Sequence, residues 1–162
     1  MTIGFRADTA RADRYASALR SDATLILRAM GLARCELSVA IVDNAAIRAL
    51  NREYRRQDKP TDVLSFSQVE EPGAPPPDPA ALTDDPATLL GDVVISIDTA
   101  LAQARAQGVT ARERLRTLLI HGILHLIGYD HERSAGDARR MFAREREIAA
   151  AIAVSRKRSA RR

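Results

Sequence analysis

The chain of 162 residues is 46% hydrophobic and 28% charged, a balance typical of one soluble globular domain. Its single cysteine, Cys35, excludes an internal disulfide framework. No run approaches the roughly 20 apolar residues of a membrane helix, and the N-terminal residues contain no signal-peptide core. We therefore expect a cytoplasmic protein without a membrane partner, and the sequence leaves its oligomeric state open.

The net charge of +4 is unevenly distributed. Residues 155–162 hold five basic side chains and no acidic one, and their removal leaves 20 basic against 21 acidic residues, a net charge of −1. We predict one domain over residues 1–154 and a basic, disordered tail over residues 155–162. The tail either adds sequence-independent affinity for nucleic acid or only increases solubility.

Two elements are predicted at the start of the chain. Residues Arg11 to Met30 show the apolar spacing of an amphipathic helix, and Gly31 is its stop signal. Residues 37–42 are rich in β-branched side chains and predict a strand.

A second helix and a second strand follow. Asp43 or Asn44 is the expected N-cap of the helix. We expect three side chains of this helix to face the core: Ile47, Leu50 and Tyr54. Residues 61–66 are the next predicted strand.

A proline-rich segment from residue 70 to residue 86 contains six of the seven prolines. Proline fits neither a helix interior nor a central strand, so we predict a disordered loop between two strands. The second of these strands covers residues 90–97.

Three helices are predicted after that strand. Asp98 caps a short helix that Gly108 ends, and residues 110–113 form a capping box for the next one. Residues 134–137 open the last helix, whose expected apolar positions are Met141, Phe142, Ile148 and Ile152. The order of elements predicts an α/β (α+β) fold, a single domain in which several helices pack on a small mixed sheet.

All three histidines of the chain lie in one short run, at His121, His125 and His131. Two of them are four residues apart and share one face of the predicted helix. Gly128 offers a helix stop, so the chain can turn back and bring the third imidazole to the first two. Three imidazole nitrogens with a fourth position open for water are typical of a catalytic zinc site. Such an ion generates a nucleophile from water near neutral pH, which favours metal-assisted hydrolysis.

The histidine spacing also matches a peptidase pattern, H-E-x-x-H-x-x-G-x-x-H. The glutamate that serves as the general base in that pattern is replaced by Gly122. A metallopeptidase-like hydrolase would need a base from elsewhere, and Asp130 and Glu132 are near in sequence.

Four basic residues crowd the end of the second predicted helix and the loop after it: Arg52, Arg55, Arg56 and Lys59. Guanidinium groups match phosphate oxygens, so these residues could bind an anionic substrate. A charged helix end exposed to solvent explains the same pattern.

The run from His121 to His131 resembles the signature H-G-x-L-H-L-x-G-Y-D-H of the YbeY family, the bacterial endoribonucleases of ribosomal RNA maturation. Residues 50–66 and 90–96 are similar to two further motifs of that family, and the helix with Met141, Glu145 and Ile148 also fits. Ser67 stands where many members have proline, and the segment 70–86 is longer than usual.

The resemblance implies a zinc-dependent, single-strand-specific endoribonuclease that acts in 16S rRNA 3′-end maturation and in ribosome quality control. It implies one Zn²⁺ held by His121, His125 and His131, and it assigns a functional role to Arg55 as a phosphate-binding or charge-stabilising group. The implied partners are single-stranded ribosomal RNA and the small ribosomal subunit or its proteins.

Two questions remain open at this level. A metal-activated water leaves a 5′-phosphate on the product, whereas attack by the ribose 2′-OH leaves a 2′,3′-cyclic phosphate. The alternatives to the nuclease are the metallopeptidase-like hydrolase and a ribosome-assembly factor that acts mainly by binding.

Overall fold

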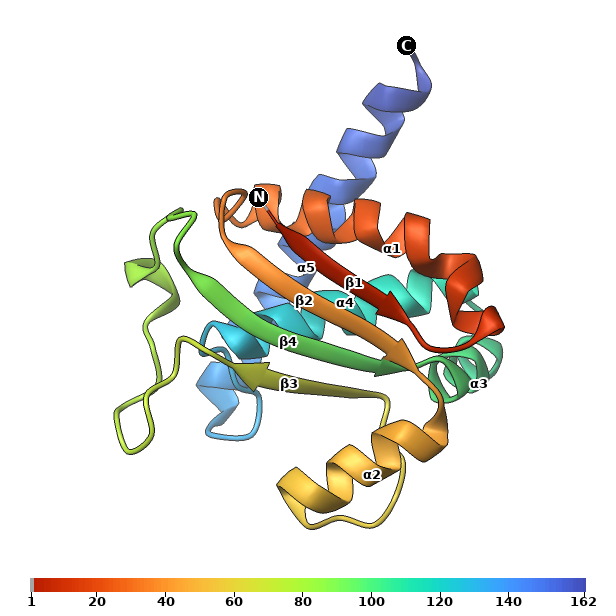
Figure 1. The fold of residues 1–162 in the computed structure, drawn as a ribbon. Coiled ribbons are helices and arrows are strands. Elements are labelled where there is room, and N and C mark those ends of the chain that lie inside the picture. Colours follow the sequence, from red (N-terminus) through yellow and green to blue (C-terminus); the bar gives the residue numbers. More distant parts are fainter. Residues whose placement is uncertain (1) are drawn as a thin grey trace.

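The computed structural model describes residues 2–162, which form a four-stranded sheet and five α-helices. The strands are β1 (Ile3–Ala7), β2 (Glu36–Val42), β3 (Val63–Ser67) and β4 (Leu89–Ser96). The helices are α1 (Ala10–Ala29), α2 (Asn44–Arg55), α3 (Ile97–Gln107), α4 (Ala111–Leu126) and α5 (Ala135–Ala160), with a 3₁₀ turn, η1, at Pro79–Ala81. The predicted α+β architecture with a small mixed sheet is confirmed (Figure 1).

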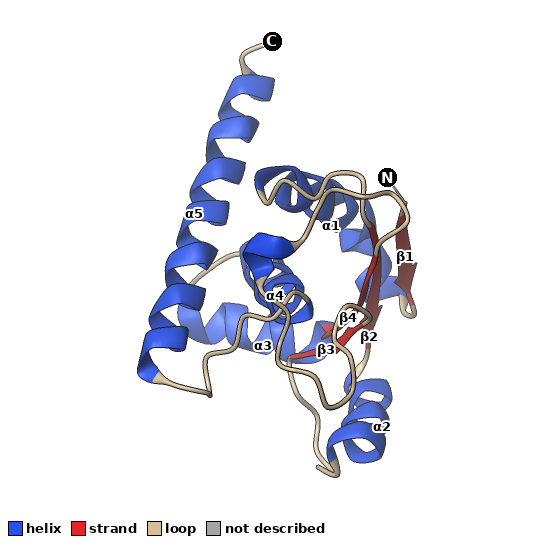
Figure 2. Ribbon diagram, turned by 90° about the vertical axis from the view of Figure 1, so that its left-hand side faces the viewer, coloured by secondary structure: helices blue, strands red, loops and turns tan. Residues whose placement is uncertain are grey.

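The sheet has the order β1-β2-β4-β3, in which β1, β2 and β4 are parallel and β3 runs antiparallel to β4. Figure 2 views it from the side, with α4 beside the sheet and α5 farther out. Helix α4 lies between them and is apolar on most sides, which explains its many fully buried residues. This central position gives α4 a fixed place against β3 and β4, so side chains on it are held precisely.

The main core fills the space between the sheet and helices α1, α4 and α5, with residues such as Leu19, Ile95 and Ile123 fully buried. A smaller cluster on the other face of the sheet joins Ile47 of α2 to Leu64 and Val94. Within residues 2–162, no helix is both long enough and apolar enough to cross a lipid bilayer.

Strand β1 is not among the sequence predictions. It is a five-residue edge strand whose side chains alternate between half-buried and exposed. Its parallel pairing with β2 decides its conformation, and this partner is distant in sequence. Local patterning therefore gave too weak a signal.

Three predicted side-chain roles are wrong. Tyr54 is 60% exposed, because it lies near the end of α2 beyond the small apolar cluster, where its ring contacts Phe66 edge-on. Phe142 is 42% exposed and faces His131 instead of the core. Ser96, and not Asp98, caps α3, because its hydroxyl accepts the hydrogen bond from the backbone of Thr99.

Two segments predicted to be disordered have defined structure. The segment 70–86 contains η1 and packs against the turn after α4, where Pro77 approaches Gly128. Residues 155–160 continue α5, so the predicted disordered tail is helical up to Ala160. Alanine-rich sequence before this region and strong helix-forming Lys and Arg within it favour the helix.

Candidate metal centre and cleft

The structure brings together the three histidines that the sequence singles out. His121 and His125 are one turn apart on α4, and His131 comes from the loop that follows it. The chain reverses at Gly128, which has a φ of 105°. A Cβ atom there would lie 2.3 Å from the carbonyl oxygen of Pro77, so only glycine fits this turn.

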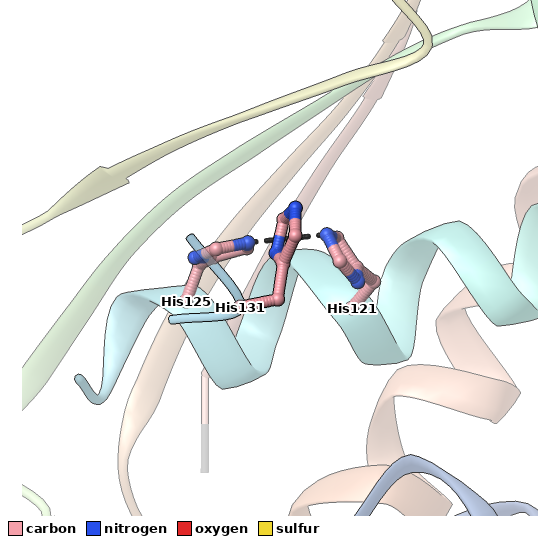
Figure 3. Close-up of side chains that lie close together, drawn as sticks. All are labelled: His121, His125 and His131. Atoms are coloured by element: carbon pink, nitrogen blue, oxygen red, sulfur yellow. Dashed lines mark hydrogen bonds between the residues drawn. The ribbon is translucent and has the colours of Figure 1, made fainter. Parts of the chain in front are cut away.

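One imidazole nitrogen from each of the three histidines lies within 4.8 Å of those of the other two (Figure 3). The Nε2 atoms of His121 and His125 are 3.1 Å apart. Two nitrogens bound tetrahedrally at about 2.0–2.1 Å from one zinc ion are separated by ~3.3 Å. The observed spacing therefore fits a shared ion, and the donor set of three nitrogens suits zinc or a similar borderline metal.

Glu145 of α5 orients His121. Its Oε1 lies 2.6 Å from Nδ1 of His121, so the Nδ1–H group donates to the carboxylate. This contact leaves the lone pair of Nε2 free and directed toward His125. Carboxylates in this position fix the tautomer of metal-binding histidines. This role of Glu145 is not among the sequence predictions, although an acidic residue between the buried Met141 and Ile148 on one helix face was a usable signal.

The surroundings keep His125 in the neutral form that a metal ligand requires. Burial lowers the pKa of His125 to about 4, and the nearby His121 and His131 also oppose its protonation. Nδ1 of His131 is buried and has no hydrogen-bond partner within residues 2–162. A buried nitrogen without a partner is costly in a protein, and a bound metal ion would satisfy it.

Gly122 allows α4 to pack closely on the sheet. A Cβ atom at this position would lie 2.7 Å from Cγ1 of Val93 and 3.2 Å from Cγ2 of Val63. The Ser65 hydroxyl donates to the Gly122 carbonyl oxygen at 2.8 Å. A glutamate here, as in the peptidase pattern, would clash with side chains of β3 and β4. The geometry therefore disfavours the metallopeptidase alternative.

Ser67, where the resemblance would place proline, adds a second link between β3 and α4. Its hydroxyl donates to the Leu126 carbonyl oxygen at 2.7 Å and accepts from the backbone of Val69 and Glu70. The serine thus satisfies a carbonyl group at the end of α4 that has no partner within the helix.

A cleft of about 500 Å³ opens between β3 and α4, and the histidines lie in its wall. Arg55 and four acidic residues also line it: Asp62, Glu70, Asp130 and Glu132. Asp130 and Glu132, whose orientation the sequence left open, therefore face the cleft. Substrate bound along β3 would meet both signs of charge.

Arg55 is the last residue of α2, and Arg56 ends the helix with a φ of 56°. The side chains of Arg48 and Arg52 form ion pairs with Asp58. Within residues 2–162, Arg55 has no such partner and lines the cleft. Arg55 is therefore available to an anionic ligand, whereas Arg52 is held by the protein itself.

Asp62 is bound by neighbouring side chains. Gln103 donates to its Oδ2 at 3.2 Å, and the Arg114 guanidinium lies 3.6 Å away. Asp130 lies 3.5 Å from Arg133, whereas the Glu132 side chain is 75% exposed. Glu132 is therefore the less restrained of the two carboxylates that follow Gly128 in the chain.

Comparison with known proteins identifies the family. The family model of endoribonuclease YbeY matches residues 5–153. The chain is 46% identical over 151 residues to endoribonuclease YbeY of Anaeromyxobacter sp. (strain Fw109-5), covering 93% of this chain and 72% of that protein. It is 49% identical over 136 residues to endoribonuclease YbeY of Geobacter metallireducens, covering 83% of this chain and 84% of the relative.

The fold also matches a solved structure. The solution structure of a Thermotoga maritima protein superposes with a TM-score of 0.62 at 25% identity, covering 97% of this chain and 93% of that one. The sequence matches span the histidine run, the cleft strand β3 and most of α5. The chain therefore belongs to the YbeY family of endoribonucleases.

Proposed function

We propose that the protein is a zinc-dependent, single-strand-specific endoribonuclease that acts in 16S rRNA 3′-end maturation and in ribosome quality control. The observation that carries the proposal is the convergence of three imidazoles on one point in the wall of a cleft that Arg55 also lines. The names of the relatives support the nuclease activity. The proposed partners are single-stranded ribosomal RNA and the small ribosomal subunit, in the cytoplasm.

The cleft can hold a substrate in an extended conformation, with Arg55 placed to contact an anionic group. It follows β3, of which Val63, Leu64, Ser65 and Ser67 line one wall. Arg55 would contact the phosphate, because its guanidinium is charged at all physiological pH values and donates two parallel hydrogen bonds. With three Phe, three Tyr and no Trp, the chain offers few platforms for base stacking. Selectivity would then come from RNA shape or from the ribosome.

The three histidines would hold the metal ion. When bound, a zinc ion supplies a Lewis acid and makes a coordinated water more acidic. Glu145 holds His121 in the tautomer that presents Nε2, and burial keeps His125 neutral. Asp130 and Glu132 place proton acceptors at the cleft, and Arg55 stabilises charge that develops on the phosphate during the reaction.

The first experiment combines metal analysis with RNA cleavage. The protein is purified without a histidine tag, its metal content is determined by elemental analysis, and it is incubated with single-stranded RNA. We expect near-stoichiometric zinc in the wild type and loss of both zinc and cleavage in His125→Ala. Arg55→Ala should keep its zinc and lose about 10²–10³-fold in cleavage rate, by analogy with removal of one charge-stabilising donor. Arg56→Ala, next in sequence and outside the cleft lining, is the matched control.

Other outcomes would replace the proposal. Cleavage that persists unchanged in His125→Ala and Arg55→Ala would mean that the site is not a nuclease centre. If folded His125→Ala restores ribosome maturation in cells lacking the wild type, the protein acts mainly by binding. Cleavage of a peptide library instead of RNA would revive the metallopeptidase. Product ends decide the nucleophile, since a cyclic phosphate excludes attack by water in the first step.

A further inference from the structure

Helix α5 extends beyond the rest of the domain (Figures 1 and 2). Its last fully buried residue is Ile152, and residues 157–162 are all exposed. We call residues 153–162 the C-terminal arm. The arm lies far along the helix from the cleft, because Glu145, which contacts His121, precedes it by more than two turns.

The arm is anchored at its base by one ion pair. Arg156 donates to the carboxylate of Asp22, which is fully buried in α1. This contact fixes the rotation of the helix about its axis. A residue two positions along an α-helix lies about 200° around it, so Arg158 points to the side opposite Arg156. Arg161 is three residues further and shares that outward side with Arg158.

The arm carries a concentrated positive charge. Five of the eight residues from 155 to 162 are basic, and the last acidic residue of the chain is Glu147. Arg156 is the only one of the five that forms an ion pair within residues 2–162. Basic residues at a helix C-terminus interact favourably with the helix dipole, which stabilises the arm as a helix but does not neutralise it. Its charge is therefore left for an external anion.

We propose that the C-terminal arm is a second RNA-binding surface, which holds the phosphate backbone of an RNA that is also bound in the cleft. The inference rests on the proposed nuclease function, and it adds a contact remote from the metal centre. Single-stranded RNA fits the arm because its phosphates are regularly spaced anions, and electrostatic binding of this kind does not require a pocket.

The position of the arm sets the length of RNA that reaches it. Arg158 is 13 residues beyond Glu145, which corresponds to ~20 Å along the helix axis at 1.5 Å per residue. A stacked strand advances about 3.4 Å per nucleotide, so roughly six nucleotides span this distance. At this rise an RNA of about four nucleotides spans only ~14 Å and does not reach from the cleft to the arm, whereas one of about twenty does.

The test compares two triple variants of the full chain. The arm variant replaces Lys157, Arg158 and Arg161 by Gln, which keeps a good helix former at each position. The control variant removes the same charge elsewhere by replacing Arg14, Arg28 and Arg105, all exposed and without ion pairs within residues 2–162, by Gln. Affinity for oligouridines of about 4 and about 20 nucleotides is measured by fluorescence anisotropy over a range of salt concentrations, with the metal removed by chelation to prevent cleavage.

We expect the arm variant to bind the long oligouridine about tenfold more weakly, with a slope of log K against log salt reduced by about 2, since each lost contact with single strands contributes about 0.7. Affinity for the short oligouridine should not change, and the control variant should show neither effect. A variant with Arg158→Lys and Arg161→Lys keeps the charge and should bind as the wild type. If the triple Gln variant fails to fold, the double variant Arg158→Gln/Arg161→Gln repeats the measurement, with an expected slope reduction of about 1.4.

Two results would overturn the inference. The first is an equal loss of affinity in the arm and control variants. The second is an unchanged affinity of the arm variant for the long oligouridine. An altered sedimentation coefficient of the protein alone would then assign the arm to an acidic surface of a second copy. Failure of the nuclease proposal looks different: the wild type would then cleave no RNA, whereas the effect of the arm on long-RNA binding would persist.

Discussion

Helix α4 carries a polar cluster in each half, and the two clusters differ in the source of their partners. In the first half, Arg112 and Arg116 reach Asp22 of α1, which also accepts from Arg156 of α5. In the second half, His121 and His125 meet His131, and Nδ1 of His131 has no partner within residues 2–162. In the first cluster the Asp22 carboxylate is matched by cations of the chain itself, although Nε of Arg112 has no partner within residues 2–162, and in the second cluster no counter-ion of the chain meets the three imidazoles together.

This difference separates stability from function on a single helix. A fully buried carboxylate such as Asp22 is tolerated only when cations compensate for its lost hydration, and here they come from two further helices. The Asp22 cluster therefore joins α1, α4 and α5. Neutral imidazoles in contact do not attract one another as the Asp22 carboxylate attracts its guanidinium groups. The histidine cluster therefore stabilises the fold only when an outside partner binds to it. Substitutions in the Asp22 cluster should lower the free energy of unfolding, whereas substitutions in the histidine cluster should lower the affinity for a metal ion.

The largest expected effect on folding comes from Asp22→Ala. The substitution leaves three guanidinium groups close together without their anion, which should cost about 3–5 kcal/mol of unfolding free energy. Urea denaturation of the metal-free protein measures the loss, and zinc affinity of the folded fraction should not change. A loss below about 1 kcal/mol would mean that the Asp22 cluster does not contribute more to stability than the histidine cluster. Asp22→Asn keeps the shape of the side chain and provides the measurement if the alanine variant does not fold.

Removal of the metal should lower stability through the other cluster only. A ligand present at 100 times its Kd stabilises the native state by about 2.7 kcal/mol, so chelation should lower the Tm of the wild type accordingly. His125→Ala should have the same Tm with and without chelator. An equal chelator effect on both proteins would show that the ion binds elsewhere.

Glu145→Gln should weaken metal binding without a large effect on folding. Loss of the carboxylate that orients His121 should reduce zinc affinity by about 10–100-fold, measured by competition with a chromogenic chelator. Glu147→Gln is the matched control on the same helix, because Glu147 is exposed and pairs only with Arg144. If both variants bind zinc equally well, Glu145 does not position the ligand.

The smallest effect is expected for Arg112→Gln within the Asp22 cluster. The Arg112 side chain is 42% exposed and lies 3.6 Å from the carboxylate, so its loss should cost less than about 1 kcal/mol. Arg116 is 19% exposed and donates at 3.3 Å, and Arg116→Gln should cost more. Equal costs in urea denaturation would mean that exposure does not weaken the Arg112 contact.

Local patterns in the sequence were sufficient to predict all five α-helices, three of the four strands and the three histidines of the candidate metal centre. Local rules were sufficient for these features: apolar periodicity marks α1 and α4, a capping box marks the start of α4 at Thr110, and the spacing of His121 and His125 sets their common face. Gly128 predicted the turn that brings His131 back to the other two histidines. These signals act over a few residues, so they can be read without knowledge of the fold.

Contacts between distant parts of the chain became visible only in the folded structure. Asp22 and Arg156 are 134 residues apart, and Glu145 of α5 contacts His121 of α4. The same holds for β1, which needs β2 beside it, and for the segment 70–86, which packs on the turn at Gly128. Tyr54 and Phe142 carry apolar side chains at helical spacing but lie where no core covers them. Periodicity records which face of an element is apolar, whereas burial and pairing depend on what packs against that face.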